Sequence, residues 1–133
     1  MPKKIPKEHE PMYYLENARS ILGNTPIEDN IYIEKKPVRE AFGTAYLAIL
    51  EAINEALIKK GITRKELPKS VDGYIAALKK YLSVNNGKLI REFDRLYDTL
   101  HIAGYYRGLI VGADTVKEEM KAAEAFIKKL TGM

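Results

Sequence analysis

Arginine and histidine, two residue types that can act on phosphate esters, stand close together in the stretch REFDRLYDTLHIAGYYRGLIVG, residues 91–112. Arg95 precedes His101 by six residues, and His101 is one of two histidines in the chain. Histidine titrates near neutral pH, and the guanidinium group of arginine matches the geometry of phosphate oxygens. The pair is therefore either a catalytic arrangement or an exposed arginine and a half-buried histidine on a packing helix.

Helical spacing places several side chains beside His101. Tyr97 precedes it by four residues and Tyr105 follows it by four, so both rings can pack against the imidazole. Asp98 and Asp94 lie three and seven residues earlier on the same side, where a carboxylate can orient the imidazole and raise its pKa. A structural His101, packed between the tyrosines and hydrogen-bonded to Asp98, is the alternative to a catalytic one.

Arg95 lies about 120° around a straight helix from His101, so the two side chains do not point at one atom. They can converge through the reach of the arginine, through a kink near the following glycines, or across a two-fold dimer. Aromatic and basic residues alternate nearby, which suits stacking on nucleobases. Arg91, at the start of this stretch, and Arg107, directly after Tyr105 and Tyr106, complete the candidate binding residues.

An arginine followed after four to six residues by histidine, late in a small helical bundle, resembles the HEPN superfamily of nucleotide-binding helical domains, which includes many toxin ribonucleases. The tyrosine-rich first helix, the long AFGTAYLAILEAINEAL helix and the tyrosines after the histidine fit this resemblance. It implies metal-independent RNA cleavage, with His101 as general acid or base and Arg95 bound to the phosphate. Leu96, directly after the arginine, departs from the usual polar residue. The whole chain also resembles a small uncharacterised family of bacterial five-helix bundles.

Composition limits the alternatives. The 133 residues include 22 Lys and Arg against 18 Asp and Glu, a net charge of +4, and no cysteine. Disulfides and thiolate metal sites are excluded, two histidines provide no metal-ligand spacing, and no cofactor is expected. Residues 59–95 hold ten bases and four acids, which makes either a phosphate-facing surface or an ordinary solvated face. We expect a cytoplasmic protein that does not insert in a membrane.

Periodic apolar residues predict five helices and no useful strand pattern. The helices are expected over residues 11–22, 37–60, 71–84, 88–107 and 114–130, with Ser70 capping the third and a short extended piece near residues 30–37. Val38, Phe42, Ala45, Tyr46, Ile49, Ile53, Ala56 and Leu57 form the inner face of the second helix. Gly104, Gly108 and Gly112, spaced by four, indicate a close helix crossing or a break, with a backbone surface for a ligand as the alternative.

The sequence therefore predicts an all-α, up-and-down bundle of four to five helices, HEPN-like, over residues 11–133, after a flexible arm over residues 1–10. Two functions stay open. The first is a small interaction or nucleotide/RNA-binding module, expected to be a homodimer. The second is a metal-independent ribonuclease of the HEPN type that uses Arg95 and His101.

Overall fold

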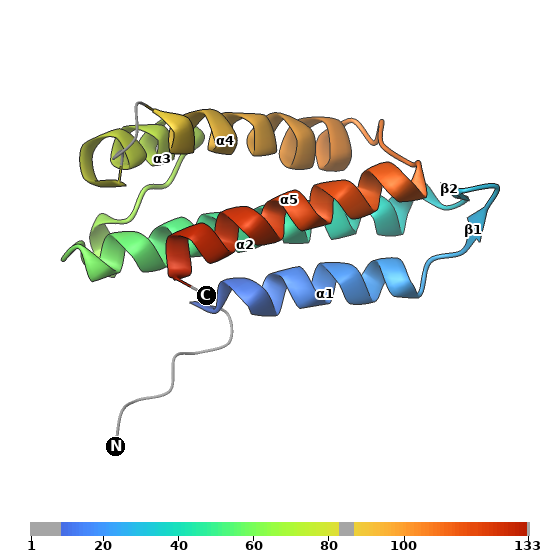
Figure 1. Ribbon diagram of the computed structural model, residues 1–133, viewed down its shortest axis with the longest axis horizontal. Helices are drawn as coiled ribbons and strands as arrows, with labels where there is room; N and C mark the ends of the chain where they lie inside the picture. Colours follow the sequence, from blue (N-terminus) through green and yellow to red (C-terminus); the bar gives the residue numbers. More distant parts are fainter. Residues whose placement is uncertain (1–8, 83–86, 133) are drawn as a thin grey trace, which may run out of the picture.

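The fold is described by a computed structural model, which covers residues 9–82 and 87–132 (Figure 1). Within these residues the α-helices are α1 (Pro11–Gly23), α2 (Lys35–Lys59), α3 (Val71–Ala77), α4 (Lys88–Leu96) and α5 (Ala113–Thr131). The other elements are strands β1 (Ile27–Glu28) and β2 (Ile31–Tyr32), a 3-10 turn at Arg64–Glu66, and two π-helical segments, η3 (Leu78–Leu82) and η4 (Tyr97–Tyr106). The prediction of an all-α bundle is confirmed.

Two predicted features lie largely outside the described residues. Of the arm predicted over residues 1–10, the structure describes His9 and Glu10, and His9 is half-buried. The predicted end of the third helix, at residues 85–87, is described at Gly87 alone. At the start of that helix, the backbone N–H of Gly73 donates to Ser70 Oγ at 3.1 Å, which confirms Ser70 as the N-cap.

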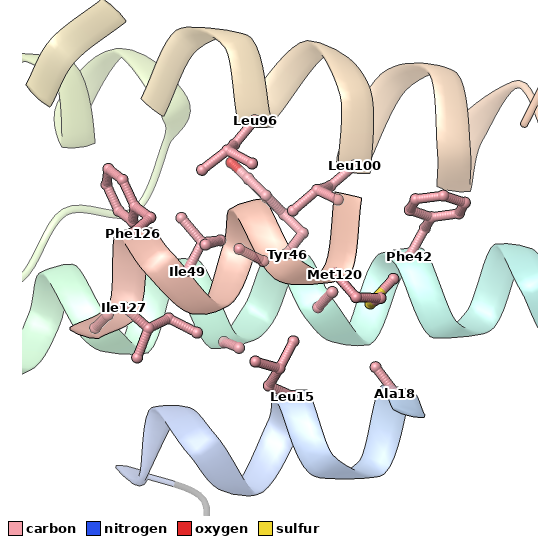
Figure 2. Close-up of a cluster of buried hydrophobic side chains, with 14 of the residues drawn as sticks. Leu15, Ala18, Phe42, Tyr46, Ile49, Leu96, Leu100, Met120, Phe126 and Ile127 are labelled. Atoms are coloured by element: carbon pink, nitrogen blue, oxygen red, sulfur yellow. The ribbon is translucent and has the colours of Figure 1, made fainter. Parts of the chain in front are cut away.

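The hydrophobic core gathers around α2, which contacts α1, α5 and η4. Figure 1 shows α5 crossing in front of α2, with α1 and α4 on either side. All eight inner-face residues predicted for α2 are buried. Figure 2 shows buried side chains of α1, α2, α4 and α5 meeting in the core. By length and composition alone α2 could span a membrane, yet 61% of its most apolar window is buried inside the bundle. Its apolar composition suits a helix with neighbours on several sides.

A two-stranded hairpin, absent from the sequence prediction except for the extended piece near residues 30–37, connects α1 to α2. Asp29 and Asn30 form its turn with φ of 51° and 62°, a region that short polar side chains tolerate. The backbone N–H of Tyr32 donates to Val111 O at 2.9 Å, and that of Ala113 donates to Asn30 O at 2.8 Å. The hairpin therefore holds the start of α5 in place.

The third and fourth predicted helices are helical in the described residues, but the α-helical geometry assumed for the fourth does not extend over its full length. Both change to π-helix, at Leu78 and at Tyr97. The second of these π-helical segments, η4, packs against α2.

Two glycines allow η4 to lie close to α2. A Cβ added to Gly104 would overlap the ring of Phe42, and one added to Gly43 would lie 2.8 Å from the ring of Tyr105. Each helix thus places an aromatic ring over a glycine of the other. Gly108, with φ of +61°, lies in the left-handed region just after η4 ends. The prediction for the glycines is confirmed in both forms, as a close crossing and as a break.

Candidate functional site

His101 lies in a stack of aromatic rings on η4. Its ring centroid is 5.4 Å from that of Tyr97 and 5.9 Å from that of Tyr105, with interplanar angles of 30° and 16°. These three residues are spaced by four along η4. Tyr46 of α2 adds a fourth ring, 4.8 Å from His101 at 28°. The predicted packing of His101 between Tyr97 and Tyr105 is therefore present, and α2 supplies a ring that helical spacing alone does not reveal.

Tyr46 is the buried member of this stack. Burial raises the pKa of its hydroxyl group to about 12, with smaller contributions from Tyr97 and Tyr74. The side chain extends from α2 toward Leu96 of α4 (Figure 2). Tyr46 is therefore neutral over the physiological pH range, and it supplies an uncharged wall behind the imidazole of His101.

Arg95 points to a different neighbour. Its Nη1 lies 3.2 Å from Glu119 Oε2 on α5, while His101 stacks on Tyr46 of α2. The reach of the arginine is thus directed to α5, and one chain does not bring Arg95 and His101 together. The side chain of Arg95 is more than half exposed, at 56%, whereas that of Glu119 is 14% exposed.

The remaining predicted site residues lie on the surface of the same helix. Asp94, Asp98, Arg91 and Arg107 are all exposed. In the part of the chain that the structure describes, no hydrogen bond joins Asp98 to His101, so the predicted orientation of the imidazole by this carboxylate is not found. Arg107 lies where η4 ends, and its backbone N–H donates to Ile102 O at 2.8 Å.

A groove runs beside the ring stack, between the first half of α2 and the end of η4. One hollow of about 430 Å³ is lined by Glu40, Gly43, Thr44, Tyr46, Leu47, His101 and Tyr105. A second, of about 560 Å³, is lined by Lys35, Lys36, Arg39, Glu40, Tyr105 and Tyr106. Glu40 and Tyr105 line both hollows, so we treat them as one α2–η4 groove. It presents rings from η4 and cations from α2.

Arg39 fixes the end of η4 at this groove. Its Nε donates to the carbonyl of Tyr105 at 2.8 Å, and its Nη2 donates to the carbonyl of Tyr106 at 2.7 Å. These bonds satisfy backbone acceptors that the helix end leaves without partners. They also position the two tyrosines, whose side chains are 45% and 69% exposed.

The sequence prediction missed Lys35, Lys36 and Arg39, although one signal identifies the two lysines. The first turn of α2 carries no acidic residue, while Lys35 and Lys36 occupy its first two positions. Cations at a helix N-terminus oppose the helix dipole and typically cost about 0.3–1 kcal/mol each. An anion bound at this end would be attracted both by the dipole and by the two ammonium groups.

Metal ligands do not gather at the groove. Among residues 9–82 and 87–132, no group of three or more His, Asp or Glu side chains is placed to hold a metal ion. The titratable groups in the groove are thus the imidazole of His101, the carboxylate of Glu40, the phenols and the three basic side chains.

Comparisons with known proteins place the chain in a family. A solved structure of a protein of unknown function from Dyadobacter fermentans is similar, with a TM-score of 0.72 and 30% sequence identity over 93% of this chain and 92% of that one. No curated protein matches. A family described as "Domain of unknown function (DUF5618)" matches residues 6–132. The chain belongs to this family.

Proposed function

We propose that this helical bundle is a binding module for single-stranded RNA or its nucleotides, and that its site is the α2–η4 groove. The observation that carries the proposal is the combination, in one groove, of exposed tyrosine rings on η4 with three cations at the N-terminal end of α2. Nucleotides offer a flat base and a phosphate, which are the complements of these two features.

Each part of the groove has a separate task. The ring of Tyr106 is 69% exposed and is the platform on which a base stacks. Stacking on an aromatic side chain contributes about 1–3 kcal/mol per base. Lys35 and Lys36 contact phosphate, helped by the positive end of the α2 dipole. Arg39 bonds the carbonyls of both tyrosines and thereby holds the platform at a fixed place relative to the lysines.

The test is fluorescence anisotropy of a labelled single-stranded RNA of about twelve nucleotides, with EDTA present. Tyr106→Ala is expected to weaken binding about fivefold or more, because it removes one stacked base. Lys35→Ala with Lys36→Ala should lower the slope of log K against log salt by about 0.7 for each lost phosphate contact. Tyr81→Ala, which removes an exposed tyrosine of η3 that does not line the groove, is the matched control.

The proposal is wrong if the folded wild-type protein binds no RNA, or if Tyr81→Ala and Tyr106→Ala weaken binding equally. The same samples, run on a gel, test the ribonuclease that the HEPN resemblance implies. Under our proposal the RNA stays intact and Arg95→Ala binds like wild type, because Arg95 is paired with Glu119 away from the groove. Cleavage lost in both Arg95→Ala and His101→Ala would instead establish the enzyme.

The homodimer and the cytoplasmic location stay predictions. Sedimentation velocity over a hundredfold range of protein concentration measures the first, and the expected result is a species of twice the chain mass of 15.1 kDa. A dimer is also the arrangement that can bring Arg95 of one copy near His101 of another, so its absence would remove that route to an assembled ribonuclease site.

A further inference from the structure

A hollow separate from the α2–η4 groove lies at the opposite, C-terminal end of α2. Its volume is about 500 Å³, within the range of small-molecule sites. It is lined by Ala56, Lys59, Lys60, Leu82, Lys88, Leu89, Lys129 and Leu130. These residues come from the ends of α2, η3 and α5 and from the start of α4, at the left of Figure 1. We name this hollow the lysine-rimmed pocket.

The rim of this pocket carries more positive charge than its neighbours neutralise. Lys59 pairs with Glu55 at 3.3 Å, and Lys129 pairs with Glu92 at 2.7 Å. Within the described residues, Lys60 and Lys88 have no carboxylate partner. Two ammonium groups thus face the pocket without a paired acid.

Helix dipoles explain part of this cluster and leave one residue unexplained. Lys59, Lys60 and Lys129 lie at the C-terminal ends of α2 and α5, where cations are favoured. Lys88 is the first residue of α4, the end at which a cation opposes the dipole. An anion held between Lys60 and Lys88 would offset this unfavourable placement and the repulsion between the lysines.

The floor of the pocket is hydrocarbon. Ala56 and Leu82 are buried, while Leu89 and Leu130 are partly buried and face the hollow. An inorganic anion would leave this apolar surface exposed to water, whereas an alkyl chain would cover it and gain about 0.8 kcal/mol for each buried methylene. A molecule with an anionic head and a hydrocarbon tail matches both the positive charge of the rim and the apolar surface of the floor.

We propose that the lysine-rimmed pocket binds a medium-chain fatty carboxylate, with its head between Lys60 and Lys88 and its tail on the leucine floor. This proposal is independent of RNA binding, because the two sites share no residue. Lys60 and Lys88 on the rim select the negative head, and the apolar floor selects the tail.

Isothermal titration calorimetry with decanoate, below its micellar concentration, tests the proposal. Decanoate should bind, octanoate about tenfold more weakly because two methylenes are lost, and acetate not measurably. Decyltrimethylammonium, which has the same tail and a positive head, should not bind. Lys60→Ala with Lys88→Ala should weaken decanoate binding at least tenfold, whereas Lys65→Ala with Lys69→Ala, two exposed lysines outside the pocket, should not.

Circular dichroism of each variant shows whether the fold is kept, and the comparison of ligands on wild type does not depend on any variant. The proposal is overturned if decanoate fails to bind, if decyltrimethylammonium binds equally, or if both lysine pairs weaken binding to the same extent. Tyr106→Ala should bind decanoate like wild type, so failure here and failure of the RNA proposal are distinguishable.

Discussion

His101 shows which part of a site a sequence can reveal. Tyr97 and Tyr105 are its neighbours by helical spacing alone, and the structure places both rings beside it. Tyr46 lies 55 positions earlier and reaches His101 through the packing of η4 on α2. Arg95 was paired with His101 by a sequence motif, but its carboxylate partner comes from α5. Contacts within one helix are thus predictable, whereas contacts between helices depend on how they cross.

Tyr46 makes the stability of the bundle sensitive to high pH. Its pKa is raised from 10.0 to about 12 in the folded chain, so the folded state binds the phenolic proton more tightly than the unfolded state does. That contribution is complete below pH 10 and is lost as the pH rises from 10 to 12. Since each pKa unit corresponds to about 1.4 kcal/mol, the loss is at most roughly 3 kcal/mol.

Tyr46→Phe isolates the contribution of this phenol, because it keeps the ring and removes the hydroxyl group that titrates. We expect the free energy of unfolding of wild type, measured in urea, to fall more steeply between pH 10 and pH 12 than that of Tyr46→Phe. Lysines titrate in the same interval, and the variant serves as their control because it keeps all of them. Parallel curves for the two proteins would show that Tyr46 ionises normally.

At the scale of elements, regular helices were predicted and irregular ones were not. The bounds of α1, α2 and α5 agree with the sequence prediction to within two residues, because capping residues and apolar periodicity are local signals. The π-helical turns of η4 carry no comparable local signal. Along η4, Gly43 and Gly104 allow α2 and η4 to approach closely, a contact between helices distant in the sequence. The hairpin was missed because each strand has two residues.

Gly104→Ala tests whether this crossing supports the π-helical segment. A Cβ here would overlap the ring of Phe42, which is fully buried and has little room to move. Overpacking of this kind costs about 1–3 kcal/mol, and we expect a corresponding loss in the urea midpoint. Gly23→Ala is the matched control: a Cβ on Gly23, at the end of α1, meets no atom within 4 Å. Equal midpoints for the two variants would contradict the close crossing.

At the scale of the whole molecule, α5 forms ion pairs with both α1 and α4. This helix lies between α1 and α4 in Figure 1. Glu124 of α5 pairs with Arg19 of α1. Two further ion pairs join α5 to α4: Glu119 of α5 with Arg95 of α4, and Lys129 of α5 with Glu92 of α4. Arg95, for which the HEPN resemblance implied a phosphate-binding role and which sequence spacing left open as an exposed arginine of a packing helix, is one partner in these ion pairs.

Glu124 makes this arrangement sensitive to acid. Hydrogen bonds from Arg19 and then Lys128 lower its pKa below 4.5, so the folded chain binds fewer protons at this group than the unfolded chain does. The stabilising contribution is present above pH 4.5 and is lost as the pH falls through the lowered pKa. Because the side chains of Arg19 and Glu124 are 39% and 27% exposed, solvent screening limits the gain to below about 1 kcal/mol.

We expect Glu124→Gln to be slightly less stable than wild type at neutral pH and to approach it as the pH falls below 4.5, because protonation then removes the same charge from wild type. Urea titrations from pH 7 to pH 3 measure this convergence. Glu118→Gln, on the exposed face of the same helix, should stay parallel to wild type, since Glu118 has no ion pair within the described residues. Convergence in both variants would mean that acid acts through the total charge of α5, and then the link between α1 and α5 would depend on apolar packing alone.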